Sequence, residues 1–163
     1  MLSVERANEL FDYNPETGVV VWKISPANCV KAGDEVGSIN NEGYRQTKVK
    51  RKCCKVHRLA WFLTHGVWPT AQIDHINGNR SDNRICNLRE ATNMENIQNL
   101  RKARSDNLST GILGVHIDPK SGRFKGKITV CGKQIHLGYF DTAQEAHEAY
   151  LIKKREVHAF CMI

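Results

Sequence analysis

The sequence predicts an α+β protein built from short antiparallel strands and a few helices. β-branched or alternating runs, such as 19–22 and 124–130, are separated by turn residues and not by long helices. Thr92 with Glu95, and Thr142 with Glu145, have the Thr-x-x-Glu spacing of a capping box that starts a helix. Each of these helix starts follows two or three strand runs, so the strands and helices are expected to form separate small layers.

Residues 1–68 predict an N-terminal α+β segment. The segment 13–18 is rich in turn residues, and apolar side chains in 57–65 recur at helical spacing. In chain order we expect a helix from the cap Ser3 to about Phe11, strands at 19–22, 44–49 and 53–56, and a helix at 57–65 that ends at Gly66.

Residues 69–104 predict a strand, loop, strand and helix in that order. The strands are expected at 73–76 and 88–90. The loop between them, 77–87, is rich in Asn, Asp, Gly and Ser, which turn tightly. The helix is expected to start at about Asn93, at the first capping box.

Residues 105–110 are expected to be a linker, and 111–163 a second, smaller domain. Strand-like runs occur at 115–117, 124–130 and 134–137, and the second capping box opens a helix toward residue 157. Alanines on one face of this helix would let it lie close to a sheet. The expected fold is a small three-stranded antiparallel sheet with one packed helix.

The composition argues against membrane and secreted classes. Hydrophobic residues make up 40% of the 163 residues, and no apolar run approaches the ~20 residues that a membrane helix needs. The N-terminal residues lack the apolar core of a signal peptide. The sequence therefore predicts a cytoplasmic protein with no membrane partner.

Positive charge is concentrated in the middle of the chain. The net charge is +7 overall, but residues 43–104 carry thirteen basic and four acidic groups. Such an excess favours a polyanion partner, with a solvated basic face as the plainer alternative. His57 and Arg58 could serve domain packing or DNA contact. The candidate DNA-binding residues of the basic run are Arg45, Lys48, Lys50, Arg51 and Lys52.

The cysteines do not have the spacing of a metal site. None of the six is paired in a C-x-x-C motif, so no structural zinc is expected. We expect free thiols, as in a reducing compartment, at Cys29, Cys53, Cys54, Cys86, Cys131 and Cys161.

The residues that could carry chemistry lie between 74 and 96. Asp74 and His75 end the first strand, Asn87 precedes the second, and Asn96 lies in the first turn of the helix. An imidazole can act as a general base, and carboxylate and amide oxygens suit hard divalent cations. Taken singly, the Asp-His pair could be a turn or a salt link, and Asn96 could be a solvated helix residue. The loop residues Asn77, Gly78, Asn79 and Asn83 could be loop formers. Their combination favours a hydrolytic metal site.

The string D-H-I-N-G-N-R-S-D-N-R-I-C-N-L-R, followed by an asparagine on a helix, resembles the HNH (ββα-metal) endonucleases, particularly their phage and intron-associated branch. The resemblance implies that His75 is the general base and that Asn87 holds the imidazole and the loop. It implies that Asp74 and Asn96 bind one divalent cation, Mg²⁺ or Mn²⁺ rather than zinc. Arg89 either contacts phosphate or holds the loop, and the sequence leaves both open.

The string L-G-Y-F-D-T-A-Q-E-A-H-E-A-Y, at 137–150, is similar to the DNA-binding domain of the plant APETALA-two (ethylene-response-factor) family. The resemblance implies a three-stranded sheet that reads the major groove. The strand Arg and Trp residues typical of that family are only partly present, so no base preference is carried over. A solvated sheet face is the alternative. The candidate DNA-binding residues are Arg123, Lys125, Lys127, Lys133, Gln134 and His136.

Together the two resemblances imply a metal-dependent HNH DNA endonuclease of the homing type. It is expected to nick double-stranded DNA and leave 5′-phosphate and 3′-hydroxyl ends. One site per chain suggests a monomer or weak dimer, and no protein partner is required. Two alternatives remain: a DNA-binding regulator with an inactive HNH scaffold, and a structure-specific or RNA-directed nuclease.

Overall fold

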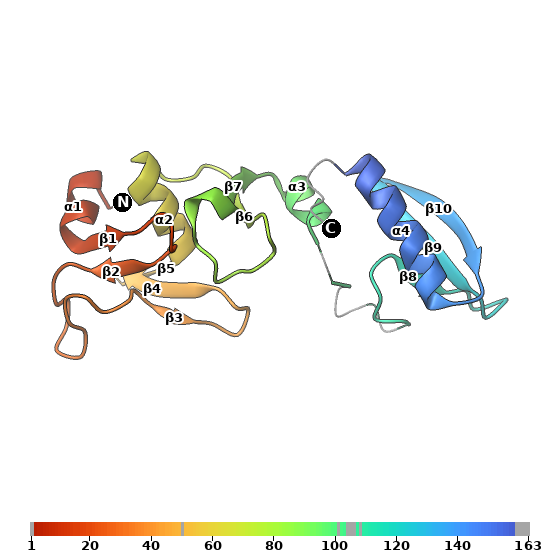
Figure 1. Ribbon diagram of the computed structural model, residues 1–163, viewed down its shortest axis with the longest axis horizontal. Helices are drawn as coiled ribbons and strands as arrows, with labels where there is room; N and C mark the ends of the chain where they lie inside the picture. The colour runs from red at the N-terminus through yellow and green to blue at the C-terminus, as the bar shows by residue number, and fades with distance from the viewer. Residues whose placement is uncertain (1, 50, 101, 104–106, 108, 159–163) are drawn as a thin grey trace. The chain divides into compact units, whose positions relative to one another are not determined.

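The computed structural model describes residues 2–49, 51–100, 102–103, 107 and 109–158. The chain divides into two compact units, Met1–Asn93 and Met94–Ile163 (Figure 1). Each unit is α+β; within the described residues the first contains three small antiparallel sheets and the second contains one. The predicted domain boundaries at 68, 104 and 110 stay a prediction.

The first unit begins with a helix and a hairpin. Helix α1 (Val4–Leu10) starts at the cap Ser3, whose hydroxyl accepts from the Arg6 amide. Strands β1 (Phe11–Tyr13) and β2 (Val20–Trp22) pair antiparallel. Strand β1 was not predicted, because it follows α1 with no turn between them and has only three residues.

The basic segment forms the second sheet of this unit. Strands β3 (Ser38–Ile39), β4 (Arg45–Val49) and β5 (Lys52–Lys55) pair antiparallel in that order. Helix α2 (Val56–His65) follows β5 and ends at Gly66, which has a left-handed φ of 72°. Glycine adopts this conformation without steric cost, which is why it stops helices, and the predicted helix end is confirmed.

Helix α2 lies at the centre of the first unit's core. Leu59, Ala60 and Phe62 on its buried face belong to one apolar cluster with Phe11 and Trp22 of the hairpin. The Phe11 and Trp22 rings are 4.7 Å apart, centroid to centroid. Fully burying such a side chain contributes about 1.5–3 kcal/mol, so this cluster attaches the hairpin to α2.

The last sheet of the first unit has two strands. Strand β6 (Gln72–His75) pairs antiparallel with β7 (Leu88–Ala91), as the sequence predicts. The loop between them ends in a short 3₁₀ turn, η1 (Ile85–Asn87), which contacts α2. Helix α3 (Asn93–Gln98) follows, so the predicted order of strand, loop, strand and helix is confirmed.

The second unit contains a sheet and one long helix. Strands β8 (Val115–Ile117), β9 (Phe124–Val130) and β10 (Lys133–Phe140) form a sheet with β9 in the middle. Helix α4 (Ala143–Val157) packs on this sheet and begins with the predicted capping box of Thr142 and Glu145. A Cβ built on Gly126 of β9 would lie 3.4 Å from the Ala146 carbonyl oxygen, so the helix and sheet approach closely.

The structure also bears on the expectations about membrane helices and about the cysteines. Within the ranges that the structure describes, no helix is long and apolar enough to cross a membrane. Five of the six cysteines are free thiols, as predicted. The sixth, Cys161, lies outside the described residues.

Candidate active site

Pairing of β6 with β7 brings a carboxylate and a guanidinium together below the protein surface. Asp74 lies directly opposite Arg89, and residues opposite each other on paired strands share a face. Arg89 donates from Nε and Nη2 to Oδ2 of Asp74, at 2.9 and 2.8 Å. Asp74 is only 6% exposed, so Arg89 balances a charge that would be costly to bury alone. Sequence reasoning placed Arg89 on phosphate or on the loop, and missed this partner.

His75 lies beside Asp74 at the end of β6 and is 4% exposed. Its Nε2 is 3.3 Å from Oδ1 of Asn83. Burial lowers the pKa of His75 below its usual value, while its hydrogen bond to Asn83 and the charge of Asp74 act in the opposite direction. The imidazole is therefore neutral near pH 7, which is the form that can accept a proton.

A second imidazole and a phenol pack against His75. The ring of His57, on α2, is 5.0 Å from that of His75 and nearly perpendicular to it. The Tyr44 ring is 5.3 Å from His57 and 5.9 Å from His75. Burial, with a smaller contribution from His75, lowers the pKa of His57 to about 3. His57 is thus a buried, neutral side chain that packs against His75, which fits the packing alternative.

Two cations lie over the Tyr44 ring of this cluster. Nζ of Lys55 is 3.8 Å from the ring centroid, and the guanidinium carbon of Arg80 is 4.9 Å from it. Such contacts are favourable because the ring face is electronegative. They place positive charge on the ring that packs against His75. Sequence reasoning did not name Tyr44, Lys55 or Arg80 as site residues individually.

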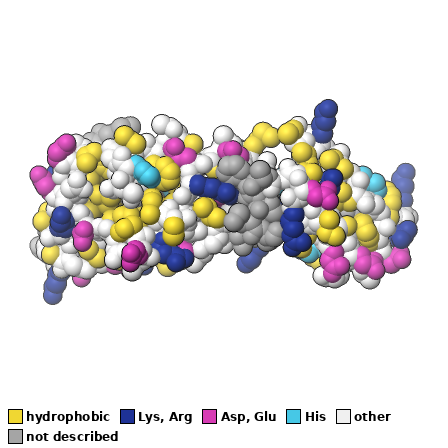
Figure 2. All heavy atoms as spheres, turned by 45° about the horizontal axis from the view of Figure 1, so that its top comes forward, with side chains coloured by type: hydrophobic (Ala, Val, Ile, Leu, Met, Phe, Trp, Pro, Cys, Tyr) yellow, Lys and Arg dark blue, Asp and Glu magenta, His cyan; other side chains and the backbone are white. Residues whose placement is uncertain are grey.

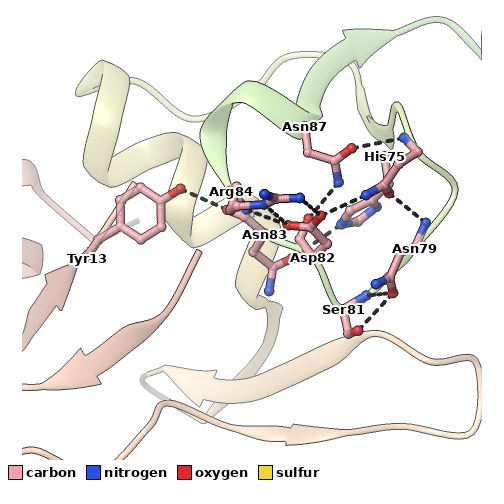
Figure 3. A network of polar contacts seen from close by, with 9 residues as sticks. Tyr13, His75, Asn79, Ser81, Asp82, Asn83, Arg84 and Asn87 are labelled. Carbon is pink, nitrogen blue, oxygen red and sulfur yellow. Dashed lines mark hydrogen bonds and ion pairs between the residues drawn. The ribbon is translucent and has the colours of Figure 1, made fainter. Parts of the chain in front are cut away.

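Side-chain hydrogen bonds hold the loop between β6 and β7 (Figure 3). Asn87 accepts from the Asn77 amide at 2.9 Å and donates to the Asp82 carbonyl at 2.8 Å. Asp82 forms an ion pair with Arg84 at 2.6 Å, and hydrogen bonds from Arg84 are the main reason that its pKa falls to about 2. Asn87 therefore holds the loop. The His75 imidazole contacts Asn83.

The second predicted metal ligand lies in the other unit. Asn96 is a half-buried residue of α3, and its pairing with Asp74 around one cation stays a prediction. The donor types fit a hard divalent cation, since both supply oxygen and Mg²⁺ sites in proteins often use only one or two such ligands. Across the described ranges there is no cluster of three or more His, Cys, Asp or Glu that could hold a metal ion.

The basic residues of the first unit divide into engaged and exposed groups. Arg45 pairs with Glu35 at 3.0 Å and donates to the Gly37 carbonyl at 2.7 Å, so it braces the β3–β4 sheet. Lys48, Arg51 and Lys52 are exposed around the β4–β5 turn. Lys50, which was predicted with them, lies outside the described residues.

The register of the second unit's sheet places most of its predicted DNA-binding residues on one face. Lys127 lies opposite His136, and Gln134 opposite Thr129; Lys125 is two residues from Lys127 and shares its face. Arg123 continues this row, but it pairs with Asp141 at 2.8 Å. Lys133 lies opposite Val130, on the face that carries the buried Gly126 and Ile128. In Figure 2, Lys and Arg side chains project from both units with acidic groups among them.

Residues 54–98 match the sequence model of a family described as HNH endonuclease. The matched segment contains Asp74, His75, Asn87 and Asn96. No curated protein matches the chain. One solved structure, entitled "DNA binding and cleavage by the HNH homing endonuclease I-HmuI", is similar with a TM-score of 0.42 and 23% sequence identity. The similarity covers 60% of this chain and 55% of that one, so this chain spans about half the length of that protein.

Proposed function

We propose that this chain, which carries an HNH endonuclease domain within residues 54–98, is a homing-type DNA endonuclease that uses a divalent cation to nick double-stranded DNA. The observation that carries the proposal is a buried imidazole, His75, next to a buried carboxylate, Asp74, in the family segment. A neutral base beside a hard oxygen ligand is what metal-assisted phosphodiester hydrolysis requires.

In the proposed reaction His75 takes a proton from a water molecule. The water oxygen attacks phosphorus in line as the bond from phosphorus to the 3′ oxygen breaks. The leaving 3′ oxygen takes a proton from solvent, and His75 then returns its proton to solvent. The products carry 5′-phosphate and 3′-hydroxyl ends. Because burial lowers the pKa of His75, the base is unprotonated and available near neutral pH.

Asp74 and Asn96 are the residues that would hold the cation. A bound Mg²⁺ or Mn²⁺ would neutralise charge on the phosphoryl and leaving oxygens. Arg89, with two hydrogen bonds to one oxygen of Asp74, fixes the orientation of that carboxylate. Lys55 and Arg80 add positive charge beside the base.

The proposed role of the second unit is to bind duplex DNA, as in the APETALA-two-like module that its sequence resembles. Its contact surface is the sheet face of Lys125, Lys127, Gln134 and His136. Lysine contacts to phosphate supply affinity, while glutamine and histidine can contact base edges. A single active site per chain cuts one strand at a time.

The test is conversion of supercoiled plasmid to open circles with Mg²⁺, with Mn²⁺ and with EDTA. We expect conversion that depends on metal and is lost in His75→Ala. His65→Ala, which changes an exposed histidine at the end of α2, is the matched control and should cleave normally. Cleavage that persists in His75→Ala would remove His75 from its proposed role.

The alternative function is a DNA-binding regulator whose HNH domain is only a scaffold. Retained plasmid binding in a gel shift, without cleavage under any metal condition, would favour it. The burial of His75 with a positioned partner argues against it, because a scaffold does not require a buried polar pair that costs desolvation free energy.

A further inference from the structure

We propose that Asn83 is a positioning residue for the base His75, and that the β1–β2 hairpin holds Asn83 in place. The inference rests on the proposed function, since it concerns how that base is oriented. Sequence reasoning had treated Asn83 as a loop former. The structure instead buries its side chain to 3% exposure, with Oδ1 at 3.3 Å from Nε2 of His75 (Figure 3).

This contact selects one tautomer of the neutral imidazole. A carboxamide oxygen accepts hydrogen bonds and does not donate them. Oδ1 of Asn83 therefore pairs with a protonated Nε2, and the lone pair of the neutral ring is then on Nδ1. Nδ1 is thus the atom that takes the proton from water, and Asn83 acts on the reaction only through His75.

Contacts from the hairpin fix the main chain of Asn83. The Tyr13 hydroxyl, at the end of β1, donates to the Asn83 carbonyl at 2.8 Å. The Pro15 carbonyl, in the hairpin turn, accepts from the Ile85 amide at 3.4 Å. These two bonds, one at Asn83 and one two residues after it, tie residues 83–85 to a segment seventy positions earlier in the chain.

The tip of the hairpin turn fits against the same segment. Gly18 has φ of +76°, and a Cβ built on it would lie 2.5 Å from the Arg84 nitrogen and 2.7 Å from the Asn83 carbonyl carbon. Only glycine allows this approach, because any side chain would collide with backbone. The hairpin is attached to the core through Phe11 and Trp22. The hairpin therefore holds Asn83 in a fixed position relative to the core.

The anchors on the rest of the loop are separate from the hairpin. Asn87 bonds to Asn77 and Asp82, and Asp82 pairs with Arg84 through its side chain. These bonds join residues of the loop to one another and fix the loop's conformation. The hairpin sets where residues 83–85 lie relative to the core, and with them the amide that contacts His75.

The first experiment reads the tautomer by ¹⁵N NMR of the imidazole nitrogens in the full-length, metal-free protein at neutral pH. We expect His75 to carry its proton on Nε2, and Asn83→Leu to lose this preference. Asn83→Asp keeps an acceptor oxygen and should retain it. A wild-type His75 with its proton on Nδ1, or an unchanged tautomer in Asn83→Leu, would overturn the proposal. This readout needs no cleavage, so it is separate from failure of the proposed function.

The second experiment measures single-turnover plasmid nicking. Asn83→Leu should lower the cleavage rate by about 100-fold with DNA affinity unchanged, because small misplacement of a reacting group has effects of that size. Asn83→Asp should recover most of the rate, and Tyr13→Phe should lose roughly 5-fold through one hydrogen bond. Asn8→Leu, at an exposed asparagine of α1, is the control. Equal rates in Asn83→Leu and Asn8→Leu would overturn the positioning role.

Discussion

The two units of this protein present their candidate functional groups in opposite ways. In the first unit, His75 and the loop after it are held by side chains that bond to side chains and to main-chain groups. In the second unit, the candidate DNA-binding groups stand on a regular sheet whose order comes from its backbone ladder and from α4. A catalytic group needs one fixed position, which buried polar contacts provide, whereas phosphate contacts tolerate movement.

The comparison predicts that the stability of the first unit falls when single buried polar groups are removed. The stability of the second unit is expected to fall when a larger side chain is placed where its helix and sheet pack closely. All three tryptophans, Trp22, Trp61 and Trp68, lie in the first unit. Tryptophan fluorescence therefore reports unfolding of the first unit, and amide signals of β9 report the second.

Arg89→Met should lower the free energy of unfolding of the first unit by about 3–5 kcal/mol, because it leaves the Asp74 carboxylate buried without its ion pair. The measurement is urea unfolding followed by tryptophan fluorescence. Nicking should also fall, since the carboxylate loses its orientation. A change below about 1 kcal/mol would mean that this pair behaves like a surface pair.

Gly114→Ala should destabilise the second unit by about 2–4 kcal/mol through overpacking. A Cβ at this position would lie 2.1 Å from the Tyr150 ring. Gly111→Ala is the matched control, because Gly111 also has positive φ but no atom within 4 Å of its Cβ position. Loss of β9 amide signals on heating should occur at a clearly lower temperature in Gly114→Ala than in Gly111→Ala, which carries only the backbone strain. Equal effects of the two variants would assign the cost to backbone strain.

Asn87→Ala should cost about 2–3 kcal/mol in the first unit, since the Asn77 amide and the Asp82 carbonyl each lose a partner. Tryptophan-detected urea unfolding measures this change. Asn79→Ala, which removes an acceptor for Ser81 in the exposed part of the same loop, should cost well under half as much. Similar costs would show that exposed and buried loop bonds contribute alike.

Asp82→Asn should cost about 1–2 kcal/mol at pH 7, and this difference should disappear near pH 2. Arg84 holds the folded-state pKa of Asp82 at about 2, below its usual 3.8. A depressed pKa gives stability that is fully present above about pH 4 and is lost as the pH falls through 2. Unfolding of both proteins across this range measures the change, and a constant difference would exclude the carboxylate charge as its source.

Arg123→Met is expected to have the smallest effect on stability, below about 1 kcal/mol. Its pair with Asp141 is exposed, with side chains 48% and 82% accessible. DNA affinity should fall modestly and with a weaker salt dependence if the predicted contact of Arg123 with phosphate is made. A stability loss as large as that of Arg89→Met would break the distinction between buried and exposed pairs in the two units.

The sequence predicts most elements of both units because their signals are local. The Ser3 cap, the Gly66 stop and the capping box at Thr142 each depend on residues within one helical turn, and all three are confirmed. Strand β10 runs to Phe140, beyond the predicted end at 137, because pairing with β9 continues past an irregularity between His136 and Gly138. Strand β1 was missed because only its pairing with β2 makes it a strand.

For the candidate site, the predicted chemistry follows from local sequence: a histidine beside an aspartate, with asparagines at family spacing, in a segment that matches HNH endonucleases. Only the tertiary structure decided the partners. Arg89 meets Asp74 through strand register, His57 reaches His75 from α2, and Tyr13 anchors Asn83 across seventy residues. Residue type and spacing fix what a side chain can donate or accept. Which group it meets depends on how distant segments pack, and no local pattern encodes that.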